Sequence, residues 1–232
     1  MVMLDTRDRD LSEALRPIGR RPWTWDTATS RYIDADGNTL PAEDQRSLLA
    51  RFLEAQRMRA AEVTEQMIDG LVTIPEWENE MRWVIKDAYG GAYMLGRGGR
   101  YQMTYRDWGY LGRAVSEQYS YLNRFAAQLV AGESEGRTRQ RANLYPLSAR
   151  QVNQRAYTYA RGAPTLPAYP GDGSSECLGN CGCYWDLAQT TLGDGGEGWN
   201  CFWVRLKSDS CETCIRRERE WAPLVIRDEQ RS

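Results

Sequence analysis

Six cysteines have the most distinctive chemistry in this chain. All of them lie in the last quarter of its 232 residues, in the order C-x3-C-x-C, a single cysteine, and C-x2-C. Two tight cysteine turns that flank a hairpin can bring four thiolates to one tetrahedral centre, which is the coordination that Zn²⁺ takes in structural sites. The pattern therefore predicts a local metal site, which a small loop-rich segment needs for its stability.

The favoured ligands of one structural zinc ion are Cys177, Cys181, Cys211 and Cys214. Cys183 competes with Cys181 for the second ligand position. Cys181-Gly182 is similar to the end of a zinc knuckle, where glycine lets backbone N–H groups turn toward the sulfur. Two other interpretations remain open, namely reduced or disulfide-linked structural cysteines and a redox-active C-x2-C pair. A catalytic zinc is disfavoured because four sulfurs close the coordination sphere.

The absence of histidine limits the catalytic chemistry available to the chain. It removes Ser-His and Cys-His catalysis and every histidine-based zinc site. The candidate carboxylates are Asp26, Asp107, Glu117 and Asp186. No two of them stand in a recognisable catalytic pattern, and Asp107 is explained as part of a helix cap. We therefore expect a protein that is not an enzyme.

The overall charge and hydrophobic pattern exclude further classes. Thirty basic residues nearly cancel 32 acidic ones, so the whole molecule has no electrostatic signature of a nucleic-acid or membrane binder. No segment approaches the roughly 18 apolar residues needed to cross a bilayer, and residues 1–10 are charged. We expect a cytosolic protein with no membrane partner. In that compartment, cysteines confined to one segment favour a metal site over a disulfide framework.

Helical periodicity begins at Pro41. Apolar residues at intervals of three and four predict a first helix over residues 41–69, which ends at Gly70. Thr73 and Glu76 have the spacing of a capping box and start a second helix.

Glycines punctuate this second helix. We expect Gly90 and Gly91 to weaken or bend it, and Gly96 with Gly98 and Gly99 to end it. The glycine-rich segment follows a helix and not a strand, so it is a weak candidate for a phosphate-binding loop.

Two further helical stretches complete the predicted body. Thr104 and Asp107 start a third helix with apolar residues stepping by three and four to about position 129. A fourth stretch covers residues 134–161, is interrupted at Pro146, and carries six arginines against one glutamate. Its basic face is interpreted as a solvated surface, and contact with packaged DNA or an acidic protein is the alternative.

Short strand-like segments flank the helices. Residues 21–40 predict an aromatic-rich hairpin or arm, and we favour a turn over a calcium loop there because Tyr32 cannot supply the first carboxylate. A turn-rich segment after Arg161 ends the helical region. Residues 183–187 and 201–206 predict a two-stranded hairpin with a glycine-rich link over 193–198.

The predicted fold is mainly α-helical, in four segments. They are an N-terminal arm with the aromatic hairpin (1–40), a body of three or four antiparallel helices (41–161), a cysteine-rich, zinc-knuckle-like β-hairpin module (162–225) and a short tail (226–232).

Several of these segments resemble bacteriophage minor head proteins, the Mu F-like head morphogenesis family. The resemblance covers about residues 20–225 and is most specific in the cysteine segment. The matching pieces are LPAYPGDGSSECLGNCGC (166–183), WV (203–204), CETC (211–214), WAPL (221–224), RYI (31–33), Trp77, YRDWGY (105–110) and YSYLNRF (119–125). Relatives often carry histidine directly before the C-x2-C, where this chain has Ser210, so mixed His/Cys coordination does not apply here.

The resemblance implies a minor capsid component, present in the phage head and in the bacterial host cytoplasm during assembly. Its expected partners are the portal protein, the major capsid protein or both, with packaged DNA as a further candidate. The alternative function is a zinc-stabilised nucleic-acid-binding module. It would use the arginine-rich fourth helix and exposed Trp and Tyr side chains of the cysteine hairpin as stacking surfaces.

Overall fold

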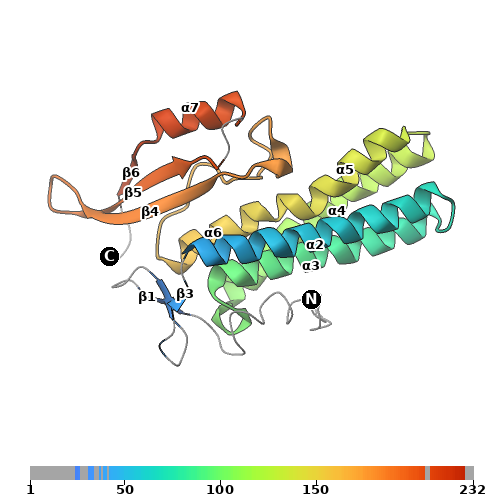
Figure 1. The fold of residues 1–232 in the computed structure, drawn as a ribbon. Helices are drawn as coiled ribbons and strands as arrows, with labels where there is room; N and C mark the ends of the chain where they lie inside the picture. The colour runs from blue at the N-terminus through green and yellow to red at the C-terminus, as the bar shows by residue number, and fades with distance from the viewer. Residues whose placement is uncertain are drawn as a thin grey trace.

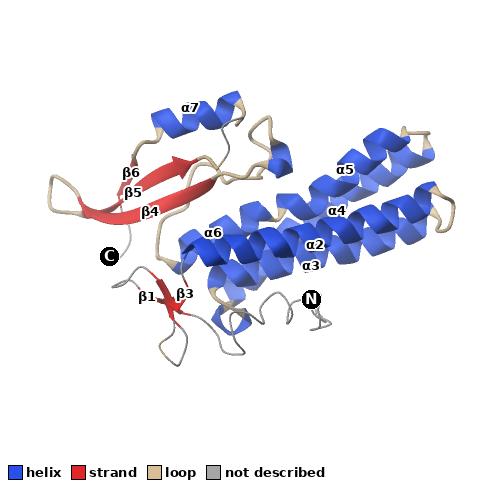
Figure 2. Cartoon of the chain, in the orientation of Figure 1, coloured by secondary structure: helices blue, strands red, loops and turns tan. Residues whose placement is uncertain are grey.

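The computed structural model describes residues 24–26, 31–33, 37, 39–40, 42–206 and 210–227. Within these ranges the chain is mainly helical, with a bundle of helices and a small antiparallel sheet beside it (Figure 1, Figure 2). The predicted fold class is confirmed. The N-terminal hairpin region forms a backbone sheet of β1 (Thr24–Asp26), β2 (Arg31–Ile33) and β3 (Thr39–Leu40). Residues 1–23 of the predicted arm and the tail from 228 onward lie outside the described residues.

Five helices form the body. They are α2 (Ala42–Ile68), α3 (Ile74–Arg97), α4 (Tyr105–Val130), α5 (Glu135–Ser148) and α6 (Arg150–Ala160). Helix α3 is central, because it packs against α2, α4, α5 and α6. Its apolar side chains meet those of its neighbours in one core that includes the buried Trp77, Leu53, Met81, Leu122 and Phe125. Burial of such side chains contributes about 1.5–3 kcal/mol each.

The capping box predicted at Thr73 and Glu76 is present, and the helix start predicted at Thr104 and Asp107 is a capping box as well. The Thr73 backbone N–H and hydroxyl donate to Oε2 of Glu76 at 2.8 and 2.7 Å. The Thr104 backbone N–H donates to Oδ2 of Asp107 at 2.8 Å in the same arrangement. These side chains satisfy N–H groups that a helix start leaves without intrahelical partners. The starts of α3 and α4 are therefore fixed by local chemistry.

The end of α3 lies at Gly98, one of the predicted glycines, but Gly96 is inside the helix. The helix continues through Gly90, Gly91 and Gly96 and ends at Gly98, whose φ of 87° suits glycine. The expectation that Gly96 helps to end the helix was wrong. A Cβ atom at Gly96 would lie 2.4 Å from the Asn153 carbonyl oxygen and 2.7 Å from Cβ of Ala156. Gly96 is needed because α6 approaches α3 closely at this point.

The break in the fourth helical stretch also lies elsewhere than expected. Pro146 is inside α5, and the two helices are separated at Ala149, three residues later. The expected interruption at Pro146 was therefore wrong in position. A proline removes one hydrogen bond and crowds the turn before it, which leaves the residues that follow free to complete a last helical turn.

The C-terminal module is a three-stranded antiparallel sheet with one helix. The predicted hairpin is confirmed as β4 (Tyr184–Thr191) and β5 (Glu197–Val204). Two elements had not been predicted, namely α7 (Glu212–Glu220) and β6 (Leu224–Arg227), which pairs with β5. Strand β6 ends at Arg227, two residues beyond the predicted limit of the module.

Tryptophans form the core of this module. Trp185 and Trp203 are fully buried and meet edge to face, with ring centroids 5.2 Å apart. Trp221 stacks on Trp185 at 5.3 Å, and Trp199 is also buried. The expectation that the hairpin exposes its Trp side chains for base stacking was therefore wrong. Large rings bury more apolar area than any other residues that a sheet this small could carry.

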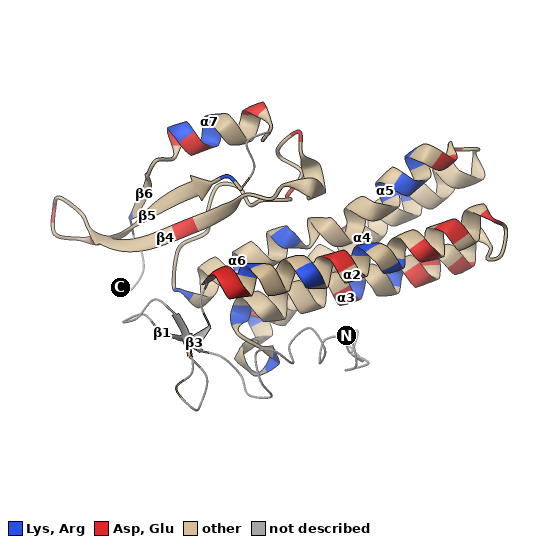
Figure 3. Ribbon diagram, in the orientation of Figure 1, with Lys and Arg blue, Asp and Glu red and all other residues tan. Residues whose placement is uncertain are grey.

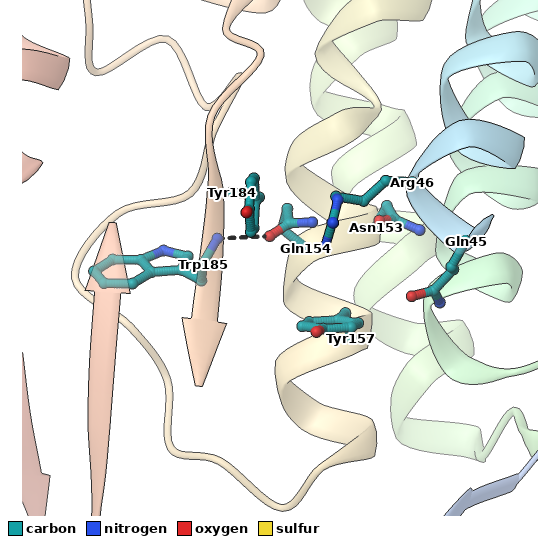
Figure 4. A pocket seen from close by; sticks show the side chains of 7 residues that line it. All are labelled: Gln45, Arg46, Asn153, Gln154, Tyr157, Tyr184 and Trp185. Atoms are coloured by element: carbon teal, nitrogen blue, oxygen red, sulfur yellow. Dashed lines mark hydrogen bonds between the residues drawn. The ribbon is translucent and has the colours of Figure 1, made fainter. Parts of the chain in front are cut away.

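A polar junction fixes the module to the helical body (Figure 4). The side-chain carbonyl of Gln154 on α6 accepts a hydrogen bond from the Trp185 backbone N–H at 3.1 Å. The Arg46 guanidinium on α2 lies 4.4 Å from the ring centroid of Tyr184. The cavity between these side chains is about 10 Å³, which is space for one water molecule. The two parts are therefore in close contact.

The α3–α6 contact can be tested with two helical glycines. We expect Gly96→Ala to destabilise the protein by about 1–3 kcal/mol, because the new methyl group overlaps the α6 backbone. Gly112→Ala on α4 is the matched control. A Cβ atom at Gly112 would have no neighbour within 4 Å beyond its own helical turn, so this change should stabilise the protein by up to about 1 kcal/mol. Denaturant unfolding measures both, and equal effects at the two positions would contradict the close approach.

Candidate metal centre

Five of the six cysteines meet at one place in the C-terminal module. The Sγ atoms of Cys177, Cys211 and Cys214 all lie within 4.8 Å of one another. Those of Cys181, Cys183 and Cys214 do so as well. Cys214 belongs to both groups and is fully buried. The five thiols are thus one cluster with Cys214 at its centre.

Successive tight turns position the first three cysteines. The Leu178 N–H donates to the Ser175 carbonyl at 2.9 Å, and the Asn180 N–H donates to the Cys177 carbonyl at 2.9 Å. Between them Leu178 has a φ of 49°, a left-handed conformation that is rare for a residue with a side chain. These turns fold C-x3-C-x-C back on itself, and Cys183 then leads into β4.

The start of α7 positions the other two. Cys211 is the residue before the first helical position, and its carbonyl accepts from the Ile215 N–H at 3.0 Å. Cys214 lies three residues further on, so one turn of helix brings both sulfurs to the same side. The sequence C-x2-C therefore acts here as a helix start.

Glu176 links the two cysteine segments. Its Oε1 accepts from the Thr213 hydroxyl at 2.8 Å, and its Oε2 accepts from the Thr213 N–H at 3.4 Å. A hydrogen bond from the Cys211 thiol is the main cause that lowers the pKa of this carboxyl to about 2. Arg217 adds a second link, because its Nη2 donates to the Ser174 hydroxyl at 2.9 Å.

Two helices of the body, α5 and α6, contact the turns that carry the cysteines. Arg150 Nη1 on α6 donates to the Cys181 carbonyl at 2.7 Å. A Cβ atom at Gly179 would lie 3.0 Å from the Leu144 carbonyl oxygen on α5, so only glycine lets the turn approach this closely. The cluster is consequently fixed to two helices as well as to its own sheet.

The protonation of the thiols follows from their surroundings. A hydrogen bond from the Cys183 thiol holds the pKa of Cys181 at about 6. The same hydrogen bond is the main cause that raises the pKa of Cys183, and burial is the second cause. Burial also raises the pKa of Cys214 and of Cys177. The cluster thus combines one thiol of low pKa with neighbours that keep their protons. A bound cation would displace the protons of those neighbouring thiols.

The spacing of the sulfurs fits a thiolate-bound metal ion. Cys181 Sγ and Cys214 Sγ are 3.7 Å apart. Two ligands of a tetrahedral ion with metal–sulfur bonds of about 2.3 Å are separated by about 3.8 Å. The cluster could therefore hold a metal ion with little movement of these two side chains.

The structure brings together all five predicted site residues and leaves one cysteine out. Cys201, on β5, lies outside the cluster, and burial raises its pKa to about 11. Cys181 and Cys183 both contact Cys214, so their competition for one ligand position persists in the fold. Sequence reasoning missed Glu176 and Arg150. The position of Glu176 directly before Cys177 could have suggested its role. Arg150 is distant from the cysteines in sequence, so their spacing could not have suggested it.

The candidate carboxylates have structural roles where their side chains are described. Asp107 caps α4, accepts from the Tyr93 hydroxyl at 2.7 Å and lies 3.2 Å from Arg97. Glu117 accepts from Tyr121 at 3.2 Å on the same helix. Asp186 is an exposed residue of β4. The side chain of Asp26 lies outside the described part of the structure.

The chain matches no protein-family model, no curated protein and no solved structure. Its fold and site define a helical-bundle protein with a thiol-rich C-terminal module. Among the described helices, none combines the length and the apolar composition needed to cross a membrane.

Two cysteine variants test whether the cluster binds metal. We expect Cys214→Ala to remove the metal content of the purified protein, because both groups of thiols share this sulfur. Cys201→Ala is the matched control, since it deletes an equally buried thiol outside the cluster and should leave the content unchanged. Elemental analysis of the two folded variants gives the answer, and equal metal contents would contradict a site centred on Cys214.

Proposed function

We propose that this protein is a structural component of a bacteriophage head, a minor capsid or head morphogenesis protein that binds the portal or the inner capsid surface. Its C-terminal module is stabilised by one zinc ion. The observation that carries the zinc assignment is the cluster of five thiols, four of which lie around Cys214. The assignment to a phage head is supported by the resemblance in the cysteine segment.

Zinc suits this donor set better than other common ions. Thiolates are soft ligands that favour zinc over magnesium or calcium, which prefer oxygen. Four sulfurs complete a tetrahedral sphere, so the ion would have a structural role. Cys177, Cys211 and Cys214 with either Cys181 or Cys183 supply such a set.

The module also has reason to need an ion. Its sheet has three strands, and its core consists of a few tryptophans and cysteines with a small number of apolar neighbours. A core of this size stabilises a fold only marginally, and a structural metal is one of the common remedies. The ion would join the turn before β4 to the start of α7.

The arginine-rich stretch favours an assembly role over nucleic-acid binding. Arg139 pairs with Glu65 at 2.8 Å, and Arg137 lies 3.8 Å from Glu133. Arg150 contacts the cysteine module, and Arg141 lies over the ring of Phe125. These arginines serve contacts within the protein, so the basic composition of the stretch does not require a DNA partner.

Removal of the ion tests the structural role of zinc. Native mass spectrometry should detect one zinc per chain, and a chelator should remove it. Amide exchange should then accelerate in β4, β5 and α7, because the segments that meet at the cluster separate, while α3 stays protected. Zinc-free protein with unchanged exchange in the module would contradict a structural metal.

Assembly with head proteins tests the biological assignment. Co-expressed with the portal and major capsid proteins of the same phage, the chain should co-sediment with assembled particles after nuclease treatment. A variant that loses zinc should co-sediment less if the module makes the contact. Release of the intact protein by nuclease, or its complete absence from particles, would contradict the assignment while leaving the zinc site untouched.

A further inference from the structure

A second site lies at the end of the bundle where α3 ends and α4 begins. It is a cavity of about 120 Å³ between α3, α4, α6 and the segment that follows α6. Its lining includes Arg106, Arg113, Arg155, Tyr110, Tyr159 and Tyr169. Carboxylates are frequent at the opposite end, where α2 ends and α3 begins (Figure 3), and the first turn of α2 also carries Glu43 and Asp44. The cavity itself combines three guanidinium groups with aromatic hydroxyls.

The positive charge of this cavity is not neutralised from within. Asp107 is the only acidic residue among the described residues that line it, and that carboxylate already pairs with Arg97 and accepts from Thr104 and Tyr93. In the described part of the chain, no carboxylate lies within 4 Å of the guanidinium nitrogens of Arg106, Arg113 or Arg155. Three like charges that face one cavity repel one another, so a bound anion would reduce this electrostatic repulsion.

Tyrosine rings hold two of these arginines in position. The Arg155 guanidinium lies 4.4 Å from the ring centroid of Tyr110, and that of Arg106 lies 5.6 Å from the ring of Tyr159. Contact with a ring leaves the charge in place and leaves N–H groups at the edge of the guanidinium for a ligand. The side chains are thus ordered before any ligand arrives, which lowers the entropy cost of binding.

The chemistry and the size of the cavity indicate its ligand. Arginine forks match the oxygen geometry of phosphate and form paired, charge-assisted hydrogen bonds with it. A terminal phosphate carries up to two negative charges, which suits three cations better than a single carboxylate does. A volume of about 120 Å³ holds several waters, so it admits a phosphate group, and the remainder of a larger ligand would extend out of the open side of the cavity.

We propose that this cavity binds the terminal phosphate of a phosphomonoester, with Arg106, Arg113 and Arg155 as the principal contacts. The ligand has two possible sources with the same chemistry, a small phosphorylated metabolite or the 5′-phosphate end of a nucleic acid. The site is separate from the cysteine cluster and does not depend on the head assignment.

Calorimetric titration of the full chain at low salt tests this proposal. The probes are inorganic phosphate, AMP, and a short oligonucleotide with and without a 5′-phosphate. We expect the phosphorylated probes to bind and the unphosphorylated oligonucleotide to bind at least about tenfold more weakly than its phosphorylated twin. Tighter binding of AMP identifies a small-molecule source, and tighter binding of the phosphorylated oligonucleotide identifies a nucleic-acid end.

Three variants separate the cavity from general surface charge. Arg106→Ala and Arg113→Ala change exposed residues and should each weaken phosphate binding at least about tenfold. Arg124→Ala is the matched control, because Arg124 is also exposed on α4 and lies over a tyrosine ring, that of Tyr121 at 4.7 Å. It should bind as the parent protein does. Equal losses in all three variants, no binding of any phosphorylated probe, or equal binding of the two oligonucleotides would overturn the proposal.

Discussion

The cluster of five thiols centred on Cys214 is the contact on which the C-terminal module depends. The turn before β4 and the start of α7 are also joined by hydrogen bonds of Glu176 with Thr213 and of Arg217 with Ser174, and these bonds are partly open to water. Such contacts contribute about 1 kcal/mol each. An ion bound by four thiolates contributes far more, because its binding energy becomes folding energy when the unfolded chain has no preformed site.

The tryptophan core and the cysteine cluster stabilise complementary parts of the module. Trp185, Trp203 and Trp221 pack where the sheet meets the end of α7, and the thiols meet at the start of that helix. Arg217 lies 5.1 Å from the Trp203 ring and also contacts Ser174, so one side chain connects both regions. Helix α7, which is short and very polar, is therefore fixed at both ends by contacts that are distant in sequence.

This distribution explains which features the sequence could reveal. The starts of α3 and α4 depend on Thr73 and Thr104 with partners three residues away, so local spacing predicted them. The role of Gly96 and the origin of α7 depend on α6 and on the thiol cluster, which no local pattern contains. The spacing of the cysteines indicated the site, but it could not separate Cys181 from Cys183, because both sulfurs reach Cys214 in the folded chain.

Helix α6 connects the parts of the molecule that carry its chemistry. One side of it packs against α3 at Gly96. Its Gln154 and Arg150 side chains form hydrogen bonds with the cysteine module, and its Arg155 lines the cavity that carries the three arginines. Since α6 has only 11 residues, these contacts lie within three helical turns of one another. A rigid helix that serves all three would keep the module and the cavity in a constant relation to the bundle. That arrangement suits a protein that must present fixed surfaces to its neighbours.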